Sequence, residues 1–543
     1  EGFKMELKDM KPHEVPTVQP TMGLPKDVRL STLLQVIFEQ TALEVYRHVK
    51  AHSRKPISTV TWVVTHPVDW PTAARKLMEI AAEKGGLLTP TNDMVIAAKE
   101  AGLGVPVINP ILLLSEPEAA MLHATQNDPV EIGDIIMVVD NGAGTTDIST
   151  HEIVAVQPIT RSKASGPIPH YFQESLLAQG GPWGSNWIDK ALAEQVLEQI
   201  FDEVELKQIS PCNYNKLIQE FQIVKHTYGG SGPFLNTIKI GDILIEITEG
   251  SPKDLIEEIK KRIKDKGIRI HFSNFSNLVL EDALIEDLFK PVTLEIVKTI
   301  KDRLTRAAED GELPGRIILA GGFSESPYLK KKIEEAIHWK TLFPGKPEYS
   351  IDNRLILAAD PRLAVLKGGV LHGLHHGEFR FVRIARFTYG FDFDQKIDDL
   401  DGVNYDQKIE NFKKKHEIHD FPENSISPCK KYILDLFQVL LKKGDLMSKD
   451  QRAGTRHQFE ALKKGNSFSI FESDDLKPVF TSGGTVRKLG TILLASEKKD
   501  IIKIHISFGG DKITAIARNQ TQNVTKQEKF EYEFEKQFDL DVA

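Results

Sequence analysis

Acids, glycines and threonines interrupt an apolar run in the segment IIMVVDNGAGTTDIST, residues 135–150. The five apolar residues Ile135–Val139 predict a strand that is buried on both of its faces. The residues that follow, Asp140–Gly144, predict a tight turn with special backbone angles. A phosphate-binding hairpin has this composition, and so does an ordinary hairpin with a common Asn-Gly turn.

The turn and the strand after it carry groups that suit a phosphate and a metal ion. Backbone amides and threonine hydroxyls can cradle phosphate oxygens, and here they belong to Gly142, Gly144, Thr145 and Thr146. Two carboxylates flank the turn, those of Asp140 and Asp147, and Mg²⁺ prefers carboxylate and water ligands. The hypothesis is a phosphate at the turn with a hydrated metal ion nearby.

A second glycine turn lies further along the chain. The residues Ile317–Ala320 predict a strand, and Gly321-Gly322 after it would let a flat ring or a phosphate approach the backbone. Ser326 and Pro327 then predict a helix N-terminus, which favours an anion. Three apolar residues of that helix are predicted to face inward: Leu329, Ile333 and Ile337. Simple packing is the alternative interpretation of this turn.

The elements that must position these turns alternate between strands and helices up to about residue 375. The segment ILLLSEPEAAMLHA shows strand, turn and helix in that order, and QGGPWGSNWIDKALAEQVLEQIF places Gly180-Gly181 at the entry of a helix. Four apolar residues of that helix share one stripe: Ile188, Leu192, Val196 and Ile200. Beyond residue 375, the alternating residues 501–508 and a turn at Gly509-Gly510 predict a β-hairpin. The sequence therefore predicts an α/β fold followed by a β-rich module.

Composition limits the classes of function. A chain of 543 residues is too long for one core, so two or more domains are expected. With 41% hydrophobic and 27% charged residues it has the composition of a soluble globular protein, and its net charge of −8 argues against nucleic acid or an anionic membrane as the main partner. The two cysteines, Cys212 and Cys429, suit a reducing compartment, and the predicted location is cytoplasmic, with no membrane span. No zinc site is predicted.

Four segments in one order carry a resemblance: the hairpin, the Gly-Gly helix entry, LAGGFSESPYLKKKIEEA and AVLKGGV. Together they resemble the nucleotide site of the actin-like ATPase superfamily, in particular the 70-kDa heat-shock proteins. Within that family the chain is most similar to the heat shock 70 kDa protein 12 branch, for example in WVVTHPVDWPTAARKLMEIAAEKGGL and FTSGGTVRKLGTILL. The resemblance implies an actin-like ATPase fold of two lobes and a small β-rich C-terminal module.

The resemblance also implies roles for single residues, with ATP or ADP and Mg²⁺ as cofactors. Asp140 to Asp147 match the second phosphate motif, and Glu116 matches an acid that helps to place metal-bound water, although a helix N-terminal acid is the alternative. Glu116 and Asp140 are therefore the predicted catalytic residues, and the metal is held through water by Asp140 and Asp147. The predicted nucleotide-binding residues are Gly142, Gly144, Thr145, Thr146, Gly180, Gly181, Gly321, Gly322 and Ser324.

Two further matches concern helices. Lys225 and His226 fall where the family has a helix that covers the adenine, so they would contact ribose and base or, alternatively, form a solvated helix face. Gly368 and Gly369 match the second connecting helix, where small residues let two helices cross closely.

The family's first phosphate hairpin, an Asp-x-Gly-Thr-Thr turn, is not found in the sequence, although Lys4 resembles a phosphate-contacting lysine. The expectation is a fragment or a degenerate member, with slow or absent ATP hydrolysis. The predicted domains are a partial lobe I at 1–125, lobe II at 126–345, a return helix at 346–380 and the β-rich module at 381–543.

The predicted function is that of an ATP-binding chaperone-type protein, possible partners being unfolded or client polypeptides. A non-catalytic scaffold that uses nucleotide to set its shape is the alternative, and a sugar kinase of the same fold is a further one. Phosphorylation of a sugar by the chain would support the kinase.

Overall fold

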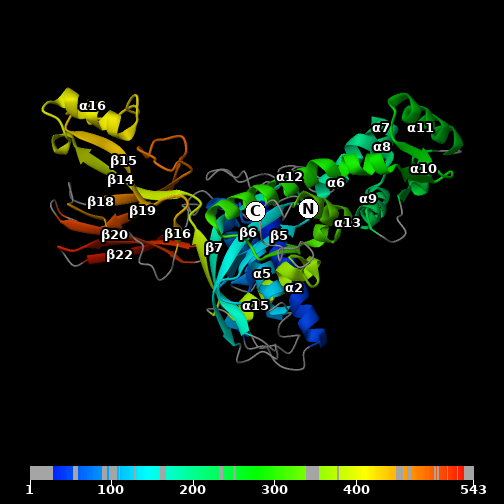
Figure 1. Ribbon diagram of the computed structural model, residues 1–543, viewed down its shortest axis with the longest axis horizontal. Coiled ribbons are helices and arrows are strands. Elements are labelled where there is room, and N and C mark those ends of the chain that lie inside the picture. The colour runs from blue at the N-terminus through cyan, green and yellow to red at the C-terminus, as the bar shows by residue number, and fades with distance from the viewer. Residues whose placement is uncertain are drawn as a thin grey trace. The chain divides into compact units, whose positions relative to one another are not determined.

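The computed structural model describes residues 29–52, 59–88, 95–96, 107–108, 110–127, 130–158, 167–230, 236–248, 252–337, 354–375, 378–447, 457–460, 466–494, 497, 500–509, 512–521 and 524–530. The described chain divides into two compact units, one that ends at Phe379 and one that begins at Arg380 (Figure 1). Lys4 lies outside the described residues.

A mixed sheet forms the centre of the first unit. Its strands follow the order β12 (Leu355–Leu357), β11 (Arg316–Ala320), β5 (Ile135–Asn141), β6 (Thr146–Pro158) and β7 (Pro167–Gly181). The first three strands run parallel, and β6 runs antiparallel to both of its neighbours, β5 and β7. The apolar residues Ile136–Val139 of β5 are fully buried, as the unbroken hydrophobic run predicts. Asp140 pairs in register with Ala320, so the carboxyl ends of β5 and β11 meet.

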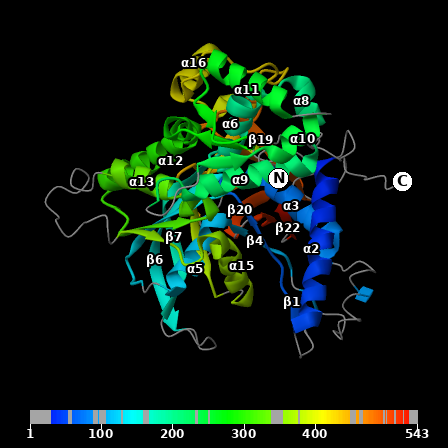
Figure 2. The same ribbon diagram turned by 90° about the vertical axis from the view of Figure 1, so that its right-hand side faces the viewer.

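Strands β2 (Val63–His66) and β4 (Leu112–Ser115) form a parallel pair within the described residues, and so do β1 (Thr59–Val60) and β3 (Val107–Ile108). The helices of this part are α2 (Leu30–His52), α3 (Thr72–Ala82), α5 (Glu116–Asn127) and α15 (Ala364–Leu374). Helices α5 and α15 run next to each other (Figure 2). They cross at Gly368, where a Cβ built on the glycine would lie 1.7 Å from the carbonyl oxygen of Ala119.

The rest of the first unit is largely helical. Its helices are α6 (Asn186–Leu192), α7 (Glu198–Ile200), α8 (Glu203–Gln208), α9 (Pro211–Thr227), α10 (Gly241–Ile247), α11 (Pro252–Lys266), α12 (Asp282–Asp310) and α13 (Pro327–Ala336). A π-helical turn (Ala193–Leu197) joins α6 to α7. Strands β8 (Thr237–Lys239), β10 (Asn277–Leu280) and β9 (Ile270–Phe272) form a small antiparallel sheet. The predicted stripe from Ile188 to Ile200 is fully buried, and the inward face of α13 is confirmed. Ser326 caps α13 by accepting from Leu329 N, as its sequence predicts.

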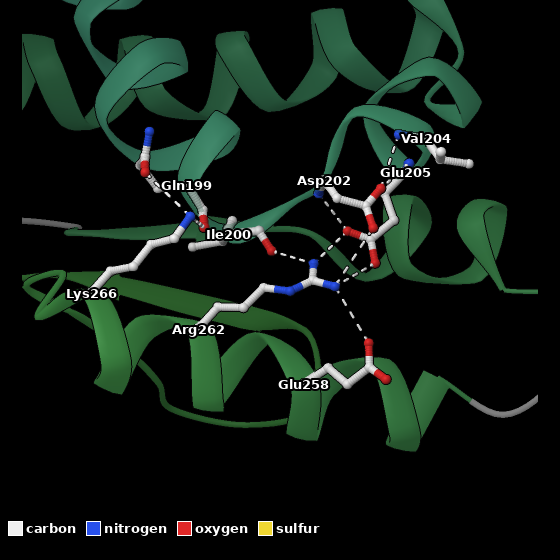
Figure 3. Close-up of polar contacts among 8 residues, drawn as sticks. All are labelled: Gln199, Ile200, Asp202, Val204, Glu205, Glu258, Arg262 and Lys266. Carbon is white, nitrogen blue, oxygen red and sulfur yellow. Dashed lines mark hydrogen bonds and ion pairs between the residues drawn. The ribbon is translucent and has the colours of Figure 1, made fainter.

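One arginine ties α11 to the turn between α7 and α8 (Figure 3). Arg262 donates to both carboxylate oxygens of Glu205 and to the carbonyl oxygen of Ile200, and it pairs with Glu258 on its own helix. Asp202 caps α8 through a capping box with Glu205. The carboxylate of Glu205 therefore stabilises the start of α8 and also accepts hydrogen bonds from Arg262.

The second unit is rich in β-structure. One antiparallel sheet has the order β15 (Tyr432–Leu441), β14 (Thr388–Lys396), β18 (Asn466–Ser473) and β19 (Val486–Leu494). Another has the order β17 (His457–Glu460), β20 (Ile501–Gly509), β21 (Lys512–Asn519) and β22 (Val524–Phe530). Strand β13 (Arg380–Ile384) pairs with β16 (Leu446–Met447), and α16 (Tyr405–His416) packs Phe412 against Phe421. The predicted hairpin of β20 and β21 is confirmed, with Gly509 opposite Lys512.

The α/β class predicted from the sequence is confirmed, with a mixed sheet and helices that are consistent with an actin-like ATPase fold. One local expectation is wrong. Neither Gly142 nor Gly144 has a φ in the left-handed region, so the turn after β5 does not need special backbone angles. No helix of the described chain has both the length and the apolar composition that crossing a membrane would require.

Candidate functional site

The turns after β5 and β11 touch each other through a glycine. Gly321 has a φ of 80°, and a Cβ built on it would lie 2.2 Å from Asn141 O and 2.5 Å from Asp140 Oδ1. No side chain fits there, and L-residues rarely adopt that φ. The sequence therefore needs glycine at this position for the two strand ends to meet, which brings the carboxylate of Asp140 to the carboxyl edge of the sheet, where ligands bind in open α/β sheets.

Polar side chains lock these two turns together. Asn141 Nδ2 donates to Ser324 Oγ at 2.8 Å, and Ser324 Oγ in turn donates to the carbonyl oxygen of Ala320. Thr146 Oγ1 lies 3.1 Å from two acceptors, Asn141 Oδ1 and Trp183 O. The hydroxyls of Ser324 and Thr146 thus have protein partners. This differs from the prediction that the Thr146 hydroxyl is presented to a phosphate, because the buried Asn141 side chain requires a donor and an acceptor of its own.

The turn after β5 is hydrogen-bonded to the segment at the start of α6. The carbonyl oxygens of Gly142, Ala143 and Gly144 accept hydrogen bonds from the amides of residues 184–186. A Cβ built on Gly184 would lie 2.2 Å from Ala143 O, so this contact needs a glycine that sequence reasoning missed. By contrast, a Cβ built on Gly144 would meet nothing within 4 Å, so the α-carbon of Gly144 faces open space. Thr145 is buried, and its carbonyl accepts from Gly142 N at 2.9 Å.

The glycine pair at the end of β7 makes room for protein side chains. Gly180 and Gly181 pair with Asp147 and Thr146 of β6. A Cβ built on Gly180 would lie 2.7 Å from Asp147 Oδ1 and 3.3 Å from Asp69 Cγ, while the indole of Trp183 covers Gly181. The described contacts of this pair explain why both residues are glycine without a ligand.

Three carboxylates lie close to that of Asp147. Asp147 is 1% exposed, its Oδ1 accepts from Val68 N at 2.8 Å, and its Oδ2 has no hydrogen-bond partner among the described residues. Burial raises the pKa of Asp147 well above its usual range, and the charges of Glu116, Asp69 and Asp140 raise it further. The hydrogen bond from the Val68 amide lowers this pKa and so opposes the shift. Glu116, Asp69 and Asp140 lie at the carboxyl ends of β4, β2 and β5, and Asp147 lies at the amino end of β6, opposite Asp140.

Asp69 is a further residue that sequence reasoning missed. Its only signal in the sequence is an acid two residues after the proline that follows β2. Within the described ranges, no group of three or more His, Cys, Asp or Glu side chains is arranged to hold a metal ion directly. The orphaned, buried Oδ2 of Asp147 fits a hydrated cation, which would reach the carboxylates through its water ligands.

Asp147→Asn is expected to raise the thermal stability of the ligand-free chain, and to raise it more at about pH 8.5 than at about pH 5.5. An acid whose folded pKa lies above its unfolded value of about 3.9 contributes stability that is complete below that value and is lost as the pH rises toward the folded pKa. Asparagine keeps an acceptor for Val68 N and has no proton to lose. Thermal unfolding of both proteins at the two pH values checks this, and a difference that does not grow with pH would contradict a buried carboxyl group that resists ionisation.

Lys225 has a structural role that the sequence did not predict. Its side chain is 2% exposed, and its ammonium group donates to both carboxylate oxygens of Asp189, at 2.7 and 2.9 Å, and to Ser185 O at 3.1 Å. Burial lowers the pKa of Lys225, while Asp189 opposes that shift. Lys225 is therefore not on a solvated helix face, and its three protons have acceptors within the protein. Its contact with ribose or base stays a prediction.

His226 is half-buried beside this pair, at the C-terminal end of α9. Its Nδ1 is buried and has no hydrogen-bond partner among the described residues. Burial lowers the pKa of His226, and the charges of Lys225 and Arg362 lower it further, whereas Glu325 and Asp189 oppose the shift. The ring is therefore neutral at neutral pH, and it is close to groups on two other segments.

Comparison with known proteins agrees with the resemblance predicted from the sequence. Heat shock 70 kDa protein 12A of Homo sapiens is 24% identical over 398 residues, which are 66% of this chain and 54% of that protein. Heat shock 70 kDa protein 12B of Homo sapiens is 25% identical over 423 residues, 67% of this chain and 57% of that protein. Heat shock 70 kDa protein 12A of Mus musculus is 23% identical over 374 residues, 61% of this chain and 51% of that protein.

The chain spans about half the length of these curated relatives. No protein-family model matches it. The predicted similarity to heat shock 70 kDa protein 12 is confirmed, at the level of a distant relationship.

Proposed function

We propose that this distant relative of the heat shock 70 kDa protein 12 proteins binds ATP or ADP with Mg²⁺ at the carboxyl ends of β5 and β11. One observation carries the proposal: Gly321 lets two strand-end turns meet, and Asp140 lies at that junction. Turns at the carboxyl ends of neighbouring parallel strands are where α/β sheets bind nucleotides.

Each of the two turns would bind one part of the nucleotide. The backbone of Gly321-Gly322 would support the adenosine, since a flat ring can approach a chain that has no side chain in the way. The open space at Gly144 would admit phosphate oxygens to the turn after β5. A bound Mg²⁺ supplies charge neutralisation at the phosphates.

The acids would act on water and metal. Asp140 and Asp147 would hold the water ligands of the cation, and Glu116, buried at the start of α5, would orient a water molecule. Catalytic roles for Glu116 and Asp140 stay predictions, as do slow or absent hydrolysis and the binding of client polypeptides by the second unit.

Asp140→Asn is expected to raise the dissociation constant for ADP about tenfold or more in the presence of Mg²⁺, because a charge-assisted contact to metal-bound water is worth about 1.5–3 kcal/mol. Without Mg²⁺ the two proteins should bind ADP alike, since adenosine rests on the other turn. Isothermal calorimetry with and without the metal measures both values.

Asp242→Asn serves as the matched control, because its carboxylate is 71% exposed on α10 and pairs with Lys216. This control should bind Mg·ADP as the wild type does. If Asp140→Asn and Asp242→Asn respond to Mg²⁺ equally, Asp140 does not belong to the site.

A further inference from the structure

A buried ion pair joins the end of α9 to the start of α6. The Lys225 ammonium group donates to both carboxylate oxygens of Asp189, at 2.7 and 2.9 Å, and to the carbonyl oxygen of Ser185 at 3.1 Å. The side chains of the pair are 2% and 12% exposed. One ammonium group therefore holds two groups that lie four residues apart at the start of α6.

The same start of α6 is hydrogen-bonded to the turn after β5. Ser185 N donates to Gly142 O at 3.1 Å, and the amides of the residues on either side of Ser185 donate to Ala143 O and Gly144 O. Ser185 is thus bonded through its carbonyl oxygen to Lys225 and through its amide to the turn. A continuous chain of hydrogen bonds runs from the buried pair to the turn that is proposed to bind phosphate.

Stability alone does not account for a charged pair at this position. The desolvation of two buried charges offsets much of their attraction, and well-packed apolar side chains of similar volume often give equal or greater stability. The pair supplies geometry instead, because an ammonium group has three donors and each of them finds an acceptor here.

We propose that the pair of Lys225 and Asp189 positions the phosphate end of the nucleotide site: it fixes Ser185, and through Ser185 the backbone of the turn after β5. The inference rests on the proposed function and deepens it, because it names residues that determine phosphate affinity without touching a phosphate. Both are positioning residues, since they act on the ligand through the backbone.

Two other interpretations make different predictions. A pair that only stabilises the fold would change the unfolding midpoint and leave the affinity of the folded chain unchanged. A direct contact of Lys225 with ribose or base would affect adenosine, whereas a displaced phosphate turn affects only ligands that carry phosphate.

The test measures the binding of adenosine, and of inorganic pyrophosphate with Mg²⁺, by the full chain. The main variant combines Lys225→Met with Asp189→Leu, so that neither charge is left buried alone. It is expected to stay folded, to bind adenosine as the wild type does, and to bind pyrophosphate about tenfold more weakly, which is the loss of roughly one charge-assisted hydrogen bond.

Two further variants complete the test. Asp189→Asn keeps one acceptor for the ammonium group, so it should show the same selective loss of pyrophosphate to a smaller extent, also where the double variant does not fold. Lys216→Met with Asp242→Leu is the matched control, because it removes an exposed pair of the same helix α9, 3.4 Å apart. This control should bind both ligands as the wild type does.

Two outcomes would overturn the inference. Folded variants of the buried pair could bind pyrophosphate as tightly as the wild type, or they could lose adenosine as strongly as pyrophosphate. A folded wild-type chain that binds neither ligand would overturn the proposed function itself, and the positioning role with it, so the two failures are distinguishable.

Discussion

Gly321→Ala is expected to abolish measurable nucleotide binding and to destabilise the first unit by about 2–4 kcal/mol, whereas Gly322→Ala leaves the stability close to that of the wild type. At Gly321 the new methyl group would lie 2.2 Å from the carbonyl oxygen of Asn141, which is part of a buried strand end. The φ of 80° adds strain that alanine cannot relieve. Thermal unfolding and titration with ADP measure the two effects.

Gly322 is the matched control because it is the next residue and its φ is unstrained. A methyl group there would meet only the Arg362 side chain, at 3.4 Å, and that flexible side chain can move. If Gly321→Ala is as stable as Gly322→Ala, the two turns do not meet as closely as the structure has them. If Gly321→Ala binds ADP as the wild type does, the junction of the two turns is not the ligand site.

The second large effect is expected at the crossing of α5 and α15. Gly368→Ala would place a methyl group 1.7 Å from the carbonyl oxygen of Ala119, so the two helices must separate. The expected loss is about 3 kcal/mol, or a fall of about 5–10 °C in the unfolding midpoint of the first unit. Calorimetric or circular-dichroism melting measures it.

Gly369→Ala controls for the change of residue type in the same helix. A methyl group there would lie 3.7 Å from Val63 Cγ1, an ordinary contact, and alanine is the better helix former by about 1 kcal/mol. Gly369→Ala should therefore melt at or slightly above the wild-type temperature. Equal melting of the two variants would mean that α5 and α15 do not pack as closely as the structure has them.

Much of the first unit was predictable from local pattern. The unbroken apolar residues of β5 and β11 are buried on both faces, and the stripe on α6 and α7 faces the core. Ser326 and Pro327 start α13 where their chemistry predicts a helix N-terminus. Each of these features depends on residues within a few positions of one another, and periodicity and capping report on that range.

The remaining features depend on partners that are distant in the sequence. Lys225 pairs with Asp189, 36 residues away, and Asp147 accepts from Val68 N, 79 residues away. Periodicity indicates which face of an element is buried but not which group lies opposite, so Lys225 resembled a surface residue. The sequence predicted Gly180 and Gly181 as ligand-binding glycines, but it could not tell a ligand from a neighbouring side chain as the reason for glycine. Gly184, where an added Cβ would meet Ala143 O, was missed altogether.

The most direct test of the central claim is the titration of the folded wild-type chain with ADP in the presence of Mg²⁺. The proposed site predicts saturable binding of one ADP per chain, and competition by adenosine, because the base end of the site lies on the turn at Gly321 and Gly322. A folded chain that shows no saturable binding up to about 1 mM ADP, which corresponds to about 4 kcal/mol of binding free energy, would contradict a nucleotide site at the carboxyl ends of β5 and β11.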